Sequence, residues 1–460
     1  MENNLVNITV NDPIYQLKSK FITKHVVEKI QEARTFIETT PQLPIIATDT
    51  YYLYYSTYPM LRHNNPDHIL EQVRQFYSEY MKKPEYRKLR NLTTLDDELS
   101  SIYSVSLLKT IIQELKKQLE KQMKKQGKGK QGKTPQQLLQ QLIQQAQQGN
   151  KTAQQQLQQM ISKALSNKKI MKQIMNTAVK KANQTTKNAK DIRDFMKGGK
   201  KAGKTGTSFE KILDLSEKIM RVSNAKEIIS MGKLIIANLP KFTKIKKKRD
   251  RHGEELAGYY RTKKIERAIA RELALPDDLF YAKLLGNGFL AKEKQTVMEG
   301  AYYVIIDKSG SMAGEKTIWA RSVALALYKL AIMKGRKYFL RFFDTEVYPH
   351  GKPASDPEEV LELILTIESG GGTMIDKALR VALRDLRKHK LIQYTNTIIL
   401  ITDGEDDVYT TKEDLRDHGA TLISIMIQGH NETLEKISDQ YFTAKLTPEG
   451  ALKLVREASR

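Results

Sequence analysis

Short apolar runs alternate with helical patterns between residue 301 and the C-terminus. Four runs have the length and the β-branched or aromatic content of buried strands: Tyr302–Ile306, Lys337–Phe343, Thr397–Ile401 and Thr421–Ile427. Apolar residues recur at helical spacing near residues 319–332, 358–367, 376–386 and 413. Because strands that alternate with helices form parallel sheets covered on both faces, this pattern predicts an α/β domain with a mostly parallel sheet. Glu346–Tyr348 is a candidate antiparallel edge strand.

Helical spacing dominates the first 300 residues. Residues 1–110 predict a helical N-terminal domain, with several prolines between its helices. Residues 111–250 are rich in Gln, Lys and Leu, which are helix formers, and predict a helical arm. In the arm, Thr134 and Pro135 suit the start of a helix that Gly149-Asn150 ends, and a second helix begins near Thr152. We predict residues 251–300 to be a helical connector and residues 301–460 to be the α/β domain.

The formal net charge of +24 is concentrated in the helical arm. Residues 111–250 hold 33 basic and 9 acidic residues, whereas the parts before and after are balanced, at 13 against 13 and 31 against 31. Such an arm suits either a solvated lysine-rich surface or nucleic-acid binding. The tyrosines between residues 51 and 58 favour core packing over base stacking, because no basic residue is interleaved with them. Nucleic-acid binding through residues 111–250 therefore stays the alternative function.

The composition excludes several classes of site and of protein. Cysteine is absent, which excludes disulfides, thiolate catalysis and cysteine-ligated zinc. The histidines are scattered, and neither H-E-x-x-H nor G-x-S-x-G occurs, so we expect no enzyme activity. No apolar stretch reaches the roughly 18 to 20 residues that a membrane span requires. The first residues also lack the pattern of a signal peptide, so we expect a cytoplasmic protein without a membrane span.

Residues Gly198–Thr205 read GGKKAGKT and fit the phosphate-loop pattern G-x-x-x-x-G-K-T. A working phosphate loop leaves a buried strand and opens a helix, so that its amides converge on the phosphates. The residues before Gly198 are polar and helix-like instead. We therefore interpret this segment as a Gly/Lys-rich loop and not as a nucleotide site.

Three polar clusters fall at the carboxyl ends of predicted strands or in a loop between helices. Asp307-Lys308-Ser309-Gly310-Ser311 and Thr402-Asp403-Gly404 each follow a strand, and Gly370–Thr373 lies between two helices. Ligands of open α/β sheets bind beyond the carboxyl ends of the strands. Carboxylate and hydroxyl oxygens are hard ligands, which suit Mg²⁺ or Mn²⁺. The alternative is that Asp307 and the serines only cap the next helix.

A D-x-S-x-S motif followed by a distant Thr and a distant Asp resembles the von Willebrand factor A (VWA) family. The resemblance implies a Rossmann-like fold and a metal-ion-dependent adhesion site formed by Asp307, Ser309, Ser311, Thr373 and Asp403. It also implies that the two serines and the threonine contact the ion directly, while the aspartates act through waters. Since Mg²⁺ seldom takes all of its about six ligands from protein, one position is left for water or for a partner's carboxylate.

Three upstream segments extend the resemblance: Phe209–Met220, Gly253–Tyr260 and Ile269–Leu285. With the VWA core they are similar to the ViaA/CoxE-like proteins, which partner MoxR-type AAA+ ATPases. The resemblance implies a non-enzymatic, Mg²⁺-dependent adaptor that acts with such an ATPase in chaperone-like maturation, cofactor insertion or remodelling of protein complexes. The client protein would present an acidic residue to the metal.

The first testable prediction concerns the segment Gly198–Thr205. We expect Lys204→Ala to leave nucleotide binding by this chain unchanged, because a lysine outside a phosphate loop has no phosphate to contact. Equilibrium dialysis with ATP measures this. Saturable ATP binding by the wild type that is lost in the variant would contradict the interpretation.

Overall fold

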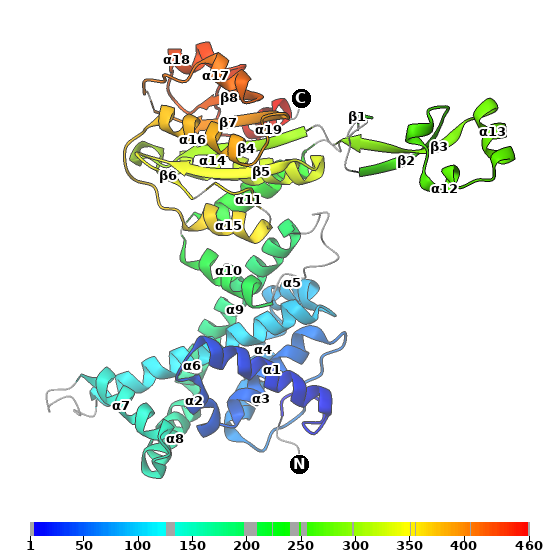
Figure 1. Cartoon of the computed structure of the whole chain (residues 1–460). Helices are drawn as coiled ribbons and strands as arrows, with labels where there is room; N and C mark the ends of the chain where they lie inside the picture. Colours follow the sequence, from blue (N-terminus) through cyan, green and yellow to red (C-terminus); the bar gives the residue numbers. More distant parts are fainter. Residues whose placement is uncertain are drawn as a thin grey trace. The chain divides into compact units, whose positions relative to one another are not determined.

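The computed structural model (Figure 1) describes residues 4–125, 134–196, 209–222, 224–239, 248–249, 255–296, 299–349, 351–354, 356–404 and 406–458. They form two compact units, one of residues 4–196 with 209–222 and the other of residues 224–458. The Gly/Lys-rich segment 198–205 lies outside the described residues, as do residues 240–247.

The first unit is mostly helical. Its helices are α1 (Pro13–Lys29), α2 (Ala33–Thr39), α3 (Gln42–Tyr55), α4 (His68–Tyr80), α5 (Pro84–Thr93), α6 (Asp97–Lys125), α7 (Pro135–Gln147), α8 (Lys151–Ser166), α9 (Lys168–Met196) and α10 (Phe209–Arg221). The long helices α6 and α9 pack against each other, and α3 packs against α6. Helix α6 runs through residue 110, where the sequence predicts a domain boundary, so residues on both sides share one hydrophobic core.

Tyrosines fill much of this core. Tyr54, Tyr77 and Tyr103 are fully buried, and the Tyr54 hydroxyl donates to the Tyr103 hydroxyl at 3.0 Å. Tyr51 is also buried and stacks on Tyr55 with 5.2 Å between ring centroids. The prediction that these tyrosines are packing residues is therefore confirmed for the buried ones.

The two helices predicted in the arm are present. Thr134 caps α7 through a capping box, in which its side chain accepts from the Gln137 N–H and the Gln137 side chain accepts from the Thr134 N–H. Asn150 caps α8 in the same region. Both caps satisfy amides that the first turn of a helix leaves without a partner, which is why these helices begin where the sequence predicts.

The second unit contains α11 (Ala225–Ala237), β1 (Lys248–Arg249), β2 (Glu255–Thr262), η1 (Ile265–Arg267), α12 (Ala270–Leu273), α13 (Asp277–Leu285), β3 (Phe289–Thr296), β4 (Glu299–Asp307), η2 (Gly310–Met312), α14 (Glu315–Lys334), β5 (Lys337–Phe343), β6 (Val347–Tyr348), α15 (Pro357–Thr366), α16 (Ile375–Lys388), β7 (Thr395–Thr402), α17 (Lys412–Asp417), β8 (Ala420–Met426), α18 (Glu432–Ile437), β9 (Gln440–Thr443) and α19 (Pro448–Glu457). Among all described residues, no helix is both long and apolar enough to cross a membrane.

A six-stranded sheet of order β6-β5-β4-β7-β8-β9 organises this unit. All neighbours pair in parallel except β6, which is antiparallel to β5. This confirms the predicted α/β fold and its antiparallel edge strand. Central strand β4 is buried on both faces, as a strand between two helical layers must be: Tyr303 and Ile305 pack with α16, and the Tyr302 hydroxyl bonds the Ala458 carbonyl after α19.

Residues 251–300 correct the prediction of a helical connector. Besides the short helices α12 and α13 they contain β2 and β3, which pair antiparallel and form a small sheet with β1. The helical pattern of residues 265–285 dominates the sequence between these strands. The strands are stabilised by pairing between residues such as Thr262 and Phe289, which lie far apart in sequence, so local spacing does not reveal them.

A buried polar group joins the sheet to α16. The Arg341 guanidinium of β5 donates to the Asp385 carboxylate of α16, and both contact the Tyr303 hydroxyl of β4. Arg341 and Tyr303 are joined at 3.0 Å, and the Arg341 and Asp385 side chains are only 6% and 10% exposed. A charge that loses its partner in such a place is costly, because water cannot replace the partner.

We therefore expect Asp385→Ala to lower the free energy of unfolding of the second unit by about 3 to 5 kcal/mol. Trp319, the only tryptophan of the chain, is buried in α14, so its fluorescence during urea unfolding reports on this unit. The control Asp417→Ala removes an exposed carboxylate from α17 and should change stability by less than about 0.5 kcal/mol. Equal stability of the two variants would contradict a stabilising role for the buried pair.

Candidate metal centre

The parallel pairing of β4 with β7 creates the base of the site. Ile306 lies opposite Ile401, so the chain leaves both strands at the same edge of the sheet, with Asp307 beside Thr402. The Thr402 hydroxyl donates to Asp307 Oδ2 at 2.5 Å, and the Ser309 N–H donates to Asp307 Oδ1 at 2.8 Å. Asp307 is almost fully buried, so these bonds fix the direction of its carboxylate.

Three oxygen atoms continue outward from this base. Ser309 Oγ lies 3.0 Å from Ser311 Oγ, and the Ser311 hydroxyl donates to Asp403 Oδ1 at 2.8 Å. Ser309 and Ser311 alternate along the loop after β4, while Asp403 follows β7 directly. The loop therefore brings two hydroxyls and a carboxylate from separate parts of the sequence into one row.

The loop before α16 closes the site from the other side. Gly370 donates its N–H to the Lys308 carbonyl at 2.6 Å, and the Gly310 N–H donates to the Gly371 carbonyl at 3.4 Å. The side chain of Thr373 lies against Gly404, where a Cβ atom would come within 3.2 Å of Thr373 Oγ1. Glycine at 404 thus permits Thr373 to approach the residue after Asp403.

The buried Arg321 holds the chain where α15 ends and this loop begins. Its guanidinium, which extends from α14, donates to the carbonyls of Ile364 and Ile367 at 2.7 and 2.5 Å. These carbonyls belong to the end of α15, where helix carbonyls lack an internal partner and where cations are stabilised. Burial nevertheless lowers the pKa of Arg321 to about 10.

The charge around the site is negative at its centre. Burial raises the pKa of Asp307, and the nearby Asp403 carboxylate raises it further. The hydrogen bonds from Thr402 and Ser309 lower this pKa but do not cancel the effect of burial. Lys316, in the first turn of α14, places its ammonium 2.6 Å from Asp403 Oδ2. Lys316 thus pairs with one of the two carboxylates, and a cation between them would favour the charged forms of both.

Lys308 is directed away from this centre. Its ammonium pairs with Asp344 Oδ2 at the end of β5 and lies 3.4 Å from the Gly370 carbonyl. Partial burial acts to raise the pKa of Asp344, but Lys308 and the Glu346 N–H outweigh it and hold that pKa below its ordinary value. This pair supports the loop between β5 and β6 without adding charge to the row of oxygens.

The donor set fits a small hard cation. Cis ligands of an octahedral ion with 2.0–2.1 Å bonds lie about 2.9 Å apart. The spacing of 3.0 Å between the two serine oxygens matches this value, and the Asp403 carboxylate lies beside them, 2.8 Å from Ser311 Oγ. All of the donors are hydroxyl or carboxylate oxygens, so Mg²⁺ or Mn²⁺ suits them better than a softer ion.

The structure brings together all five residues that the sequence suggests as a site. It also excludes the helix-capping alternative, because Gly314 is the N-cap residue of α14 and Ser309 makes no side-chain cap hydrogen bond. Two neighbours were missed in the sequence, Lys316 and Asp344. Both had a signal: Lys316 stands five residues after Ser311, and Asp344 directly follows a strand next to β4.

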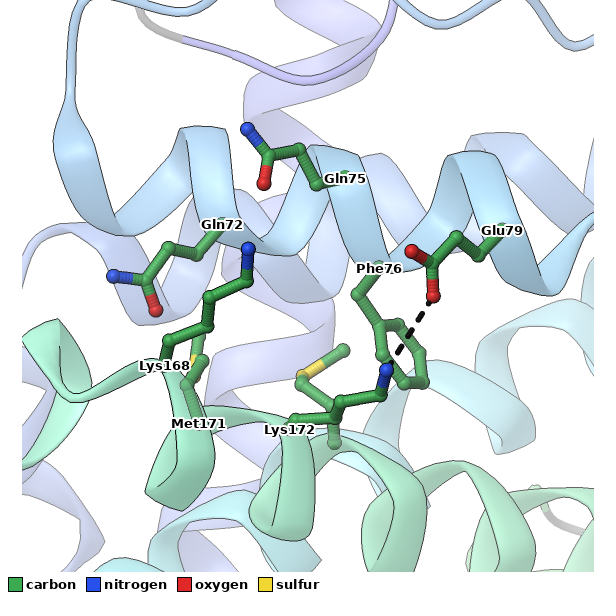
Figure 2. A pocket seen from close by; sticks show the side chains of 8 residues that line it. Gln72, Gln75, Phe76, Glu79, Lys168, Met171 and Lys172 are labelled. Atoms are coloured by element: carbon green, nitrogen blue, oxygen red, sulfur yellow. Dashed lines mark ion pairs between the residues drawn. The ribbon is translucent and has the colours of Figure 1, made fainter.

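A pocket lies in the first unit, between α4 and α9 (Figure 2). It is lined by Gln72, Gln75, Phe76, Glu79, Lys168, Met171, Lys172 and Met175. Glu79 and Lys172 pair with each other at 3.5 Å across its rim. Its lining combines long flexible side chains with two buried methionines, which is typical of a packing gap and not of a fixed polar site.

The basic helical arm uses some of its charge within the first unit. Lys116 pairs with Glu32 at 2.6 Å, and Lys117 pairs with Glu114 at 2.8 Å. Arg193 of α9 pairs with Asp96, the residue just before α6. These pairs give part of the positive charge a structural role. Nothing further favours nucleic-acid binding, which stays a prediction.

Comparison with known proteins agrees with the fold of the α/β domain. Residues 302–405 match the von Willebrand factor type A domain, and this range includes all five site residues. An uncharacterized protein of Methanocaldococcus jannaschii is 27% identical over 287 residues, which cover 58% of this chain and 64% of the relative. A second uncharacterized protein of that organism is 28% identical over 269 residues, covering 55% and 67%. The chain thus spans about two thirds of these relatives.

Solved structures that are similar to part of this chain include a von Willebrand factor type A protein from Catenulispora acidiphila. It is 22% identical with a TM-score of 0.29, and the match covers 36% of this chain and 43% of that one. The conserved hypothetical protein BatB from Bacteroides thetaiotaomicron is 16% identical with a TM-score of 0.30, covering 35% and 97%. The chain carries a VWA domain at residues 302–405.

Gly404 allows a test of the position of Thr373. A methyl group at residue 404 would lie 2.7 Å from Thr373 Cγ2 and would displace that side chain. We expect Gly404→Ala to weaken Mg²⁺ binding roughly tenfold or more. Unfolding followed by Trp319 fluorescence should change by less than about 1 kcal/mol. Calorimetric titration with Mg²⁺ measures the first effect.

Gly310→Ala is the matched control, since no described atom lies within 4 Å of the added methyl group. It should bind Mg²⁺ as the wild type does. If Gly404→Ala also binds at wild-type affinity, Thr373 does not contribute to the metal centre.

Proposed function

We propose that the protein is a non-enzymatic, Mg²⁺-dependent adaptor that binds other proteins through its VWA domain. The observation that carries the proposal is the pair of Ser309 Oγ and Ser311 Oγ at the spacing of cis ligands, with the Asp403 carboxylate beside them. Hydroxyl ligands are neutral, so an ion held by them keeps much of its charge for a further ligand. VWA domains are often involved in protein–protein interaction, which agrees with this use of the site.

The charge at the centre favours an acidic partner. Asp307 and Asp403 bring two negative charges, and Lys316 returns one positive charge. A divalent ion would leave this group with an excess of one positive charge. A carboxylate from the client can neutralise that excess while it occupies the open position on the ion. The serine and threonine hydroxyls, the lysine and the buried Asp307 would thus hold and orient the ion, and the client would supply the last ligand.

We also propose that the adaptor works in the cytoplasm with a MoxR-type AAA+ ATPase. This part rests on the resemblance of residues 209–220, 253–260 and 269–285 to the ViaA/CoxE-like proteins. Helix α13, within the third segment, has no buried residue although all nine of its residues are described. Leu279, Tyr281 and Leu285 are 55%, 59% and 80% exposed, which makes this helix a suitable contact for the ATPase.

The metal centre can be separated from folding by a single substitution. We expect Asp307→Ala to fold, because Asp307 lies at the edge of the sheet, beyond the apolar core. It should lose Mg²⁺ binding, since neutral hydroxyls cannot replace the lost carboxylate around a hard cation. Capture of client proteins should weaken in proportion to the loss of metal. Calorimetry, circular dichroism and capture from native cell extract with and without chelator measure the three properties.

The double variant Ser309→Ala with Ser311→Ala should behave in the same way, whereas Asp417→Ala, which removes an exposed carboxylate elsewhere in the domain, should keep both metal and clients. A folded Asp307→Ala protein that captures its clients at wild-type affinity would place the contact outside the metal centre. Loss of the ATPase from the captured material only when α13 is altered, for instance by Leu285→Glu, is expected for the second part of the proposal.

A further inference from the structure

A second group of metal-ligating side chains lies in the first unit, in a different unit from the VWA domain. His25 and Glu28 are one turn apart on α1, and Glu210 is in the first turn of α10. One ligand atom from each of the three residues lies within 4.8 Å of the others. Nδ1 of His25 is 3.3 Å from Glu28 Oε2 and 3.9 Å from Glu210 Oε1. Residues 185 positions apart in sequence thus converge on one point.

His25 is held rigidly with this nitrogen directed at the two carboxylates. The residue is only 6% exposed, and its ring packs against Phe21 and Phe209 at centroid distances of 4.4 and 4.8 Å. Within the described part of the chain, Nδ1 of His25 has no hydrogen-bond partner. A buried imidazole nitrogen without a partner is unfavourable, so a ligand bound to this atom would be stabilising.

The glutamates can complete the coordination by small rotations. Their side chains are 45% and 55% exposed, so they can turn about their own bonds while the histidine stays in place. Ligand atoms of a tetrahedral ion with bonds near 2.0 Å lie about 3.3 Å apart, which is the present spacing of His25 and Glu28. Glu28 also lies 3.7 Å from Lys24, an exposed pair that an ion would readily displace.

We propose that His25, Glu28 and Glu210 form a second metal site, for a divalent ion of the Zn²⁺ class. One imidazole nitrogen with two carboxylates is a ligand set that Zn²⁺ accepts, and it leaves a fourth position for water. The VWA centre offers oxygen ligands alone and therefore prefers Mg²⁺ or Mn²⁺. The two sites thus select different ions, and this proposal does not depend on the proposed function of the VWA domain.

An ion at this point would join α1 to α10. The same two helices are already linked one turn further on by Lys29 and Asp214, and Lys109 of α6 pairs with Glu217 of α10 at 2.6 Å. The Lys29–Asp214 pair is partly exposed, and such ion pairs stabilise weakly in water. A coordinated ion would fix α10, the last helix of the first unit, more firmly to α1.

The test is a Zn²⁺ titration of the full chain, in competition with a chromogenic chelator. We expect the double variant Glu28→Gln with Glu210→Gln to bind one equivalent fewer than the wild type, or to bind that equivalent at least roughly tenfold more weakly. Its Mg²⁺ binding should be unchanged. Hydrogen exchange of the α10 amides should slow on addition of Zn²⁺ to the wild type and should not respond in the double variant.

Asp214→Asn is the matched control, because it removes a carboxylate from α10 that pairs with Lys29 on the same two helices. It should keep the full Zn²⁺ stoichiometry. His25→Asn should lose the equivalent, with circular dichroism to check its folding. Equal Zn²⁺ stoichiometry in the wild type and the double variant would overturn the proposal. Equal loss in Asp214→Asn would overturn it too.

Discussion

The parallel pairing of β4 with β7 is the constraint on which the proposed metal centre depends. It sets Ile306 opposite Ile401, so Asp307 and Asp403 leave neighbouring strands at the same edge of the sheet. Parallel strands need helical crossovers, and the crossovers cover both faces of the sheet with apolar side chains. The polar residues that the core excludes therefore gather at the carboxyl ends of the strands, where the site forms.

Buried charge explains why this edge of the sheet suits a cation. The Asp307 carboxylate is enclosed by the ends of two strands and is held by Thr402 and Ser309, yet burial still raises its pKa. A structure that only needed to be stable would gain by an apolar residue here. Lys316 pairs with Asp403, and Lys308 pairs with Asp344, so part of the local charge is balanced. The negative charge that remains suits a divalent ion whose last ligand comes from another protein.

Much of the α/β domain could be predicted from local patterns. The run before Asp307 and the run before Asp403 are short, apolar and bounded by polar residues, so their strands and the position of the site follow from the sequence. The pairing of β2 with β3 could not be predicted, because it joins residues such as Thr262 and Phe289 across an intervening helical pattern. The contacts of Lys316 were missed for a related reason: the sequence marks a helix there, but only the fold turns that helix toward Asp403. The cluster of His25 with Glu210 depends on how α10 packs on α1, which no spacing rule contains.

The most direct test of the central claim is an X-ray structure of the VWA domain with Mn²⁺, in which the anomalous signal locates the ion. Our account predicts one peak within about 2.2 Å of the oxygens of Ser309, Ser311 and Thr373, with Asp307 and Asp403 beside it. It also predicts that the peak is lost in Asp307→Ala crystals. A peak elsewhere, or a row of oxygens that stays without an ion at saturating Mn²⁺, would contradict the claim that these residues form a metal centre.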